Sequence, residues 1–473
     1  MLIKQANSTT KGLECRWGCF YLIAEMLQSL LILSAGLTTV PQQRWLEMAV
    51  YLTGLIVEKN VTSTSIAGAV GLLSHDRLSR LLTTFGLQLS KAACLAVRFV
   101  EALGIEGFLI IDDVLIPKPF AKAIALCAWD WDHSRKRNTF GQRLVFIVWS
   151  NGWLIIPLLF TFWQKAQGES KRKRKLRGKG RRRKLGRPIT DNSAKARQRR
   201  VRRRAKMLLA KKRRKRLSDG RHYRSKNQLA RVMFYLLMRR GLKVRFILFD
   251  NWYASKQNIC LFERFGLYWA TRVRDNIKVF YKAETIKVKE VARSVKKANY
   301  HYYSRLKARA RSFEVEVAGK LRKLTVIKDD TSPESCSTKY LLTNCRQLTT
   351  CQHIEWYRRR WLIEIFFRDA KQHFGLCGCE ARTERTVISH VALVCIAYTF
   401  MQLFRPNDAE QRPSLKTSKY AMAGLIIVRL KNKCSVVSQL SDGKLQTASL
   451  TVFWHIARTR LPAIVLPESP VFL

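Results

Sequence analysis

A stretch of 15 residues in the second half of the chain, 357–371, combines one carboxylate with several cations and contains no proline or glycine. This mixture of apolar and charged positions is typical of a helix. At about 100° per residue, Arg360, Glu364, Arg368 and Lys371 fall on one stripe with Tyr357. A single carboxylate among cations suits a site that holds a metal ion and binds phosphate groups. Taken alone, the stretch is equally compatible with a solvated charged face.

Two apolar segments upstream each end in aspartate. The run 108–111 ends at Asp112 and Asp113, and the run 244–249 ends at Asp250. A carboxylate that follows a buried strand lies at the edge of the sheet, where α/β proteins place their sites. The ordinary alternative is that these aspartates are turn or cap residues.

Three carboxylates that converge from separate elements repel one another unless cations neutralise them. Asp112, Asp250 and Glu364 would form such a set, with Asp113 as the alternative to Asp112. Mg²⁺ or Mn²⁺ favours oxygen ligands of this kind. Two such ions, roughly 4 Å apart, activate a water or a 3′-hydroxyl and stabilise the leaving oxygen of a phosphodiester. The set therefore predicts a two-metal site for phosphodiester chemistry.

The composition indicates a polyanionic partner. The chain has 473 residues, a formal net charge of +55 and a pI near 10.6, while its apolar fraction of 47% is that of a globular protein. Nucleic acid is the first candidate, and a ribosome-type protein or a binder of anionic membranes is the alternative. Twelve scattered cysteines without a CxxC pair indicate free thiols in a reducing cytoplasm. We therefore expect a cytoplasmic protein associated with nucleic acid.

Two segments bear on the domain organisation. Residues 171–224 contain 28 Lys/Arg and two Asp. So charged a segment cannot form a core of its own, which predicts a disordered or DNA-ordered insertion. Residues 144–163 are apolar enough to span a membrane, but Asn151-Gly152 lies at their centre. That dipeptide predicts a hairpin of two buried strands, so we expect no membrane segment there.

The first 100 residues are predicted to be helical and to bind DNA. Within them, residues 65–80 resemble a helix-turn-helix, in which Ala67 and Gly71 permit a close helix crossing. Ser74 would cap a second helix that presents Arg77 and Arg80. A plain helical hairpin is the alternative.

Three segments resemble the motifs of bacterial insertion-sequence transposases of the DDE class. They are Ile-Asp-Asp-Val-Leu-Ile-Pro-Lys at 111–118, Leu-Phe-Asp-Asn-Trp-Tyr at 248–253, and residues 357–371. The last is similar, at every signature position, to the Y-x2-R-x3-E-x6-K pattern of the YREK group. The resemblance covers roughly residues 105–400 and implies a ribonuclease H-like core, which the order of the predicted elements also matches. The separation of 114 positions between Asp250 and Glu364 implies an inserted domain, and the alternating patterns in this interval predict that it is β-rich.

The resemblance also implies roles for individual residues. Asp112, Asp250 and Glu364 would be the metal-binding triad, with two Mg²⁺ or Mn²⁺ ions. Val114 stands where relatives have Thr or Ser, so Asp113 stays an alternative; Asp112 is preferred because it directly follows the apolar run. DNA contacts are expected from the following residues: Tyr357, Arg360, Arg368, Lys371, Lys118, Arg77 and Arg80.

The expected organisation is an α/β protein with flanking helical regions. A helical DNA-binding region spans 1–100, the catalytic core spans 105–273 and 350–400, the β-rich insertion spans 274–349, and a helical region spans 401–473. The expected function is cut-and-paste transposition at terminal inverted repeats by a homodimer in a synaptic complex. The alternatives are a non-catalytic nucleic-acid-binding protein derived from a transposase and a ribonuclease H-like nuclease without strand transfer.

Overall fold

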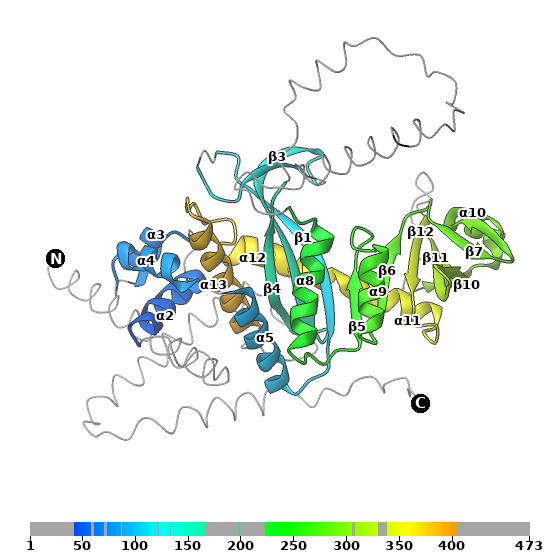
Figure 1. The fold of residues 1–473 in the computed structure, drawn as a ribbon, viewed down its shortest axis with the longest axis horizontal. Helices are drawn as coiled ribbons and strands as arrows, with labels where there is room; N and C mark the ends of the chain where they lie inside the picture. The colour runs from blue at the N-terminus through cyan, green and yellow to red at the C-terminus, as the bar shows by residue number, and fades with distance from the viewer. Residues whose placement is uncertain are drawn as a thin grey trace, which may run out of the picture.

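One large mixed sheet runs through the protein (Figure 1). The computed structural model describes residues 42–57, 61–70, 73–86, 88–120, 123–132, 134–165, 198, 223–304, 308–329 and 338–403. The expected basic insertion 171–224 and the expected C-terminal region 401–473 lie almost entirely outside these residues. The described sheet has 12 strands, with the main order β2-β3-β1-β5-β6-β12-β11-β10-β7-β8, while β4 pairs with β3 and β9 with β10.

The strands lie in two groups along the chain. The first group is β1 (Phe108–Pro117), β2 (Ala128–Asp132), β3 (Arg137–Ser150), β4 (Ile155–Trp163), β5 (Phe246–Phe249) and β6 (Tyr268–Val273). The second group is β7 (Lys278–Tyr281), β8 (Glu284–Lys287), β9 (His301–Tyr303), β10 (Ala308–Val317), β11 (Lys320–Asp329) and β12 (Thr338–Thr343). The hairpin expected at 144–163 is confirmed, since β3 and β4 pair antiparallel and are joined by a turn that contains Asn151 and Gly152.

The helices fall into three groups along the chain. Upstream of β1 lie α2 (Gln42–Val57), α3 (Ser63–Val70), α4 (His75–Phe85) and α5 (Leu89–Leu103). Between the strands lie α8 (Lys226–Arg239), α9 (Lys256–Arg264), α10 (Val288–Arg293) and the short 3-10 helix η1 (Lys297–Asn299). After β12 come α11 (Thr350–Arg358), the 3-10 turn η3 (Arg359–Trp361), α12 (Leu362–His373) and α13 (Glu384–Leu403).

The centre of the sheet combines antiparallel and parallel strands. β1 pairs antiparallel with β3 on one side and parallel with β5 on the other, and β6 continues in parallel beyond β5. A parallel neighbour needs a crossover connection, and α9 supplies it between β5 and β6. The short hydrophobic strand β5 is buried at every position, as expected for a strand covered on both faces.

The β-rich segment between Asp250 and Glu364 continues this sheet. Strand β12 pairs antiparallel with β6, and β11, β10 and β7 follow outward from it. The β-rich character expected for 274–349 is therefore present. Its strands are not a separate sheet, because β6 and β12 exchange backbone hydrogen bonds directly. We refer to strands β7–β12 as the sheet extension.

Helices cover the two faces of the central strands separately. On one face α5, α8 and α9 pack against β3, β4 and β6, while on the other α12 and α13 pack against β1 and β4 (Figure 1). Because strand side chains alternate, each strand supplies both cores. In β1, Phe108, Ile110 and Val114 belong to the core on the α12 side. Leu109 and Ile111 belong to the core on the α8 side.

The N-terminal helices divide between two places. Helices α2, α3 and α4 contact one another, and α2 and α4 pack on α13, whereas α5 lies against β4 and α8. Ser74 caps α4 as expected, because its side chain accepts a hydrogen bond from the Arg77 amide. Gly71 lies outside the described residues. The close crossing of α2 and α3 instead occurs at Gly54, where an added Cβ would lie 2.4 Å from Ile66.

Helix α13 is long and apolar enough to cross a membrane by length and composition alone. In the structure 78% of its apolar window is buried inside the protein. It contacts α2, α4, α12 and β4, so it serves as a core helix that joins the N-terminal helices to the sheet. A helix of this kind is expected to be hydrophobic on all sides.

Candidate functional site

The two aspartate segments meet at one edge of the sheet. Ile111 of β1 lies opposite Phe249 of β5 in a parallel pair, so Asp112 and Asp250 directly follow a matched pair of residues. Parallel neighbouring strands advance in the same direction, which brings the two aspartates side by side. The Asp250 carboxylate also accepts a hydrogen bond from the Trp252 amide, so it closes the turn after β5 as well as facing the site.

The pleat of β1 separates Asp112 from Asp113. Asp112 follows the alternation of Ile110 and Val114, whose side chains pack on the α12 side of the sheet. Asp113 follows Leu109 and Ile111 to the α8 side. The structure therefore places Asp112, and not Asp113, on the face from which Glu364 approaches.

Arg360 connects the carboxylates of β1 and α12. Its Nη1 donates to Asp112 Oδ2 at 2.7 Å, and its Nη2 donates to Glu364 Oε1 at 2.5 Å. Burial alone would lower the pKa of Arg360, but Asp112 and Glu364 raise it above its ordinary value. The guanidinium is thus held charged between a carboxylate four positions away and one 248 positions away in sequence.

Asp112 lies in a crowded acidic environment. Burial raises the pKa of Asp112 to about 8, Arg360 opposes this rise, and the neighbouring Asp113 and Asp250 add to it. A further positive charge close to this carboxylate would favour its ionised form. This is the electrostatic situation that a divalent cation relieves.

The donor set fits Mg²⁺ or Mn²⁺ in chemistry. Asp112, Asp250 and Glu364 would supply hard oxygen ligands, which both ions prefer. Within the described part of the chain, no three Asp, Glu, His or Cys side chains lie together as a ready metal site. Arg360 instead provides the positive charge between Asp112 and Glu364. Ion binding at these carboxylates would require Arg360 to move aside.

The helix expected over 357–371 is helical throughout but interrupted. Helix α11 ends at Arg358, the 3-10 turn η3 follows, and α12 begins at Leu362. The break does not separate Tyr357, Arg360 and Glu364 of the expected stripe, because Arg360 contacts both of the others. The apolar side chains Ile363, Phe366 and Phe367 of this segment are buried in the core on the α12 side of the sheet.

Tyr357 lies beside the carboxylate site. Its ring is 5.8 Å from the Arg360 guanidinium. Burial raises the pKa of Tyr357, Arg360 lowers it, and Asp250 raises it further, which places the phenol close to both groups. The first position of the Y-x2-R-x3-E-x6-K pattern is thus an aromatic ring that packs on the bridging arginine.

The other expected DNA-contacting cations are distributed differently. Lys371 Nζ donates to the Leu115 carbonyl at 3.0 Å, and burial lowers its pKa. Arg368 is exposed and pairs with Asp369 at 3.1 Å. Lys118 is buried, and its ammonium donates to the carbonyls of Cys377 and Cys379, so here it fixes a loop instead of facing solvent.

The two arginines of α4 lie far from the carboxylates in the fold. Arg77 pairs with Glu47 of α2 at 3.3 Å. Arg80 is exposed, and its side chain reaches back to the Asp76 carbonyl. They lie on the helical unit that packs on α13, so any contact they make with DNA is separate from the carboxylate site.

A second cluster, centred on Asp113, was not expected from the sequence. Asp113 Oδ2 lies 3.0 Å from Arg143 Nη1 and 2.9 Å from Lys226 Nζ, and its Oδ1 accepts from the Tyr253 hydroxyl at 3.0 Å. Lys226 Nζ also lies within 5.3 Å of the ring centres of Trp163 and Trp252. These residues come from β3, β4, α8 and the turn after β5, and no local spacing relates them. The cluster holds the two central strands and α8 together directly behind Asp112.

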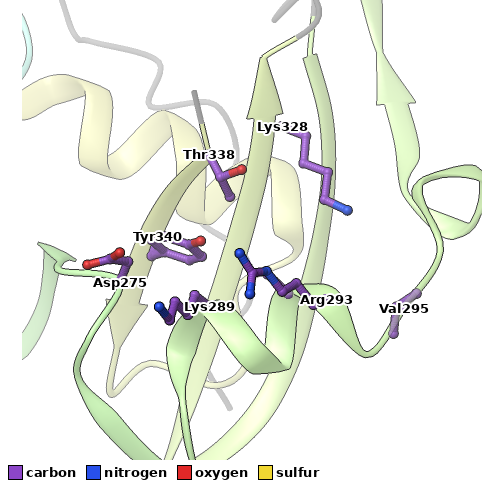
Figure 2. A pocket seen from close by; sticks show the side chains of 8 residues that line it. Asp275, Lys289, Arg293, Val295, Lys328, Thr338 and Tyr340 are labelled. Carbon is purple, nitrogen blue, oxygen red and sulfur yellow. The ribbon is translucent and has the colours of Figure 1, made fainter. Parts of the chain in front are cut away.

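A polar pocket of about 530 Å³ lies elsewhere, between α10 and strands β11 and β12 (Figure 2). Figure 2 shows Lys289 and Arg293 on α10 facing Tyr340, with Asp275 at one rim. The remaining lining residues are Ala292, Val295, Lys328 and Thr338. In the sheet order β12 is three strands away from β1, so this pocket is separate from the carboxylates.

Comparison with known proteins identifies the family. A family model described as DDE superfamily endonuclease matches residues 33–325, which is more than half of the chain. No curated protein matches the chain. The matched segment includes Asp112 and Asp250, while Glu364 lies beyond its end. This match, together with the mixed α/β sheet that brings the two aspartates together, shows that the chain belongs to the DDE superfamily of endonucleases, which act on DNA.

Proposed function

We propose that this protein is the transposase of an insertion sequence. It would bind terminal inverted repeats, cut the DNA at the element's ends and join the freed 3′-hydroxyls to target DNA. The observation that carries the proposal is the Arg360 bridge between Glu364 and Asp112, with Asp250 next to Asp112 at the sheet edge and Tyr357 beside Arg360. The similarity of residues 357–371 to the YREK pattern supports the same assignment.

The central strands support a ribonuclease H-like core. In the order β4-β3-β1-β5-β6, the first three strands are antiparallel neighbours and the last two continue in parallel from β1. This mixed sheet supports the fold that the resemblance implies. The sheet extension then occupies the long interval between Asp250 and Glu364, where an inserted unit is expected.

The chain's own residues would divide the work at the site. Asp112, Asp250 and Glu364 would hold two Mg²⁺ or Mn²⁺ ions, which when bound supply an activated water or 3′-hydroxyl and stabilise the leaving oxygen. Arg360 is placed to exchange its carboxylate partners for a DNA phosphate, with which guanidinium also pairs in a bidentate manner. Tyr357 packs on Arg360 and would orient it in either arrangement.

The charge of the whole protein favours binding to DNA. The net charge of +55 supplies a general attraction for phosphates, which brings DNA to the protein without selecting a sequence. Selection would come from residues that contact bases, either in the N-terminal helices or in the sheet extension. Two ends must be joined in one event, so we propose a homodimer in a synaptic complex within the cytoplasm.

The test uses the full-length protein and a linear DNA that carries the inverted repeats flanking its own reading frame. With Mg²⁺ or Mn²⁺ we expect cleavage at the repeat ends and joined products with a target plasmid. Glu364→Gln and Asp250→Asn should each abolish cleavage while binding to the repeat DNA stays within about two-fold of the wild type. Glu380→Gln, at an exposed position outside the site, is the matched control and should retain activity.

Three outcomes would lead to other assignments. Cleavage by Glu364→Gln or Asp250→Asn at wild-type rate would remove that residue from the triad. Cleavage without joined products would identify a nuclease that lacks strand transfer. Binding without metal-dependent cleavage by the wild type would identify a non-catalytic DNA-binding protein.

A further inference from the structure

Strand β2 exposes two tryptophans on one side. In its sequence Ala-Trp-Asp-Trp-Asp, Trp129 is 62% exposed and Trp131 is 44% exposed. Alternation along a strand places both rings on the same face and the two aspartates on the other. Large aromatic side chains on a solvated strand are costly to leave uncovered, so a paired arrangement of this kind indicates an interaction surface.

This tryptophan face is continuous with the carboxylate face of the sheet. Trp129 lies opposite Phe140 of β3, and the two ring centres are 5.5 Å apart. Phe140 is on the same side of β3 as Leu144 and Phe146, which pack in the core beneath α12. The tryptophans therefore extend the side of the sheet on which Asp112 faces Glu364, just beyond the end of α12.

The register of β3 gives the separation between the two features. Asp112 lies opposite Phe146, and Trp129 lies opposite Phe140, six residues earlier on the same strand. At about 3.3 Å per residue, this is roughly 20 Å. A DNA strand with its bases stacked advances about 3.4 Å per nucleotide, so this separation corresponds to about six nucleotides.

The charge around the tryptophans is positive. Arg135, Lys136 and Arg137 are exposed at the turn between β2 and β3. The negative charges of β2 are already satisfied on the opposite side, because Asp130 pairs with Arg143 at 2.7 Å and Asp132 accepts from Ser134 and Arg135 within the turn. The exposed rings thus lie beside a turn that carries three cations, a combination that favours nucleic acid over an apolar protein partner.

We propose that Trp129 and Trp131 form a stacking platform for unpaired bases of the DNA strand that passes the carboxylate site. The proposal rests on the proposed function, since it assumes that the DNA strand bound at the carboxylate site is the one that reaches the two tryptophans. Bases inside a duplex have their faces covered, so only unpaired nucleotides can stack on the rings. Arg135, Lys136 and Arg137 would hold the phosphates of that segment.

The experiment compares two fluorescein-labelled DNAs that share the terminal repeat. One is blunt, and the other carries an unpaired tail of about six nucleotides at the cleaved end. Binding of the full-length protein is measured by fluorescence anisotropy. The wild type should bind the tailed DNA more tightly than the blunt DNA. Trp129→Ala and Trp131→Ala should each weaken binding to the tailed DNA by about ten-fold and leave binding to the blunt DNA within two-fold.

The controls separate stacking from a loss of folding. Trp131→Phe keeps an aromatic ring and should retain most of the preference for the tail. Trp153→Ala changes a tryptophan that is 37% exposed in the turn at the other end of β3, and it should leave both affinities unchanged. A tail preference that survives in both alanine variants, or an equal loss on both DNAs, would overturn the platform. Failure of the wild type to bind either DNA would instead refute the proposed function.

Discussion

Arg360 donates a 2.7 Å hydrogen bond to Asp112, across a sequence separation of 248 residues. The same guanidinium also pairs with Glu364, one turn further along the chain. One side chain therefore ties the central strand β1 to the helical segment that follows the sheet extension. It also supplies positive charge at the point where metal ions are proposed to bind.

Replacing Arg360 should destabilise the protein most when divalent ions are absent. Removing one partner of a buried ion pair leaves the other charge unpaired and typically costs about 3 kcal/mol. Arg360→Ala should therefore lower the melting temperature in EDTA. Millimolar Mg²⁺ or Mn²⁺ should raise the melting temperature of the variant by more than it raises that of the wild type. Thermal unfolding of both proteins in each buffer is the measurement. An identical deficit with and without the ions would show that the carboxylates do not take up metal.

Asp112 and Asp113 should respond differently to the same chemical change. Asp112→Asn removes a charge from the face shared with Glu364, and we expect it to abolish cleavage. Asp113→Asn weakens the pairs with Arg143 and Lys226 on the other face, so it should lower thermal stability and retain part of the activity. Cleavage assays and melting curves on both variants decide this. An inactive, fully stable Asp113→Asn protein together with an active Asp112→Asn protein would exchange their assignments.

The basic segment 171–224 should contribute affinity without sequence selectivity. Each phosphate neutralised on duplex DNA adds about 0.9 to the slope of log K against log salt. Deleting the segment should weaken binding to repeat and random DNA alike and make that slope shallower, while the ratio between the two DNAs is retained. Titrations at several salt concentrations provide the slopes. A slope that stays the same after the deletion would exclude contact between this segment and DNA.

Two buried histidines should make the fold sensitive to acid. Burial lowers the pKa of His353 to about 3 and that of His390 to about 4, while in the unfolded chain both titrate near 6.5. At a pH between the folded and the unfolded pKa, the unfolded chain binds more protons than the folded protein. The free energy of unfolding is therefore fully retained above pH 6.5 and falls as the pH decreases toward 4. Each histidine contributes about 1.4 kcal/mol per pH unit in that window.

Substitution isolates this effect from general acid denaturation. His353→Gln should reduce the slope of unfolding free energy against pH between 6.5 and 4, although the variant starts from a lower stability. His301→Gln, at an exposed position, serves as the control and should keep the wild-type slope. Denaturant unfolding at half-unit pH steps measures both. An unchanged slope in His353→Gln would mean that this side chain accepts its proton in the folded state.

The sequence by itself determined the local elements of this protein. A turn dipeptide between two apolar runs was enough to predict the hairpin of β3 and β4. The helical character of residues 357–371 was predicted as well, because their mixture of apolar and charged positions is typical of a helix. The carboxylates were also predicted from local pattern, because two of them directly follow an apolar run and the third lies within a helical one.

Only the tertiary structure decided which of these groups meet. Asp112 and Asp113 are adjacent in the chain, and the sequence does not state which helix covers which side of β1. The packing of α12 on one face and α8 on the other places Asp112 on the side of Glu364. The 3-10 turn at 359–361 interrupts the helix expected over 357–371, and the pairing of β12 with β6 makes the expected insertion part of one sheet. The cluster of Arg143, Lys226 and Tyr253 around Asp113 joins three elements far apart in sequence. Local propensity reports on neighbours within a few residues, whereas these contacts depend on where distant strands and helices are brought by burial of their apolar faces.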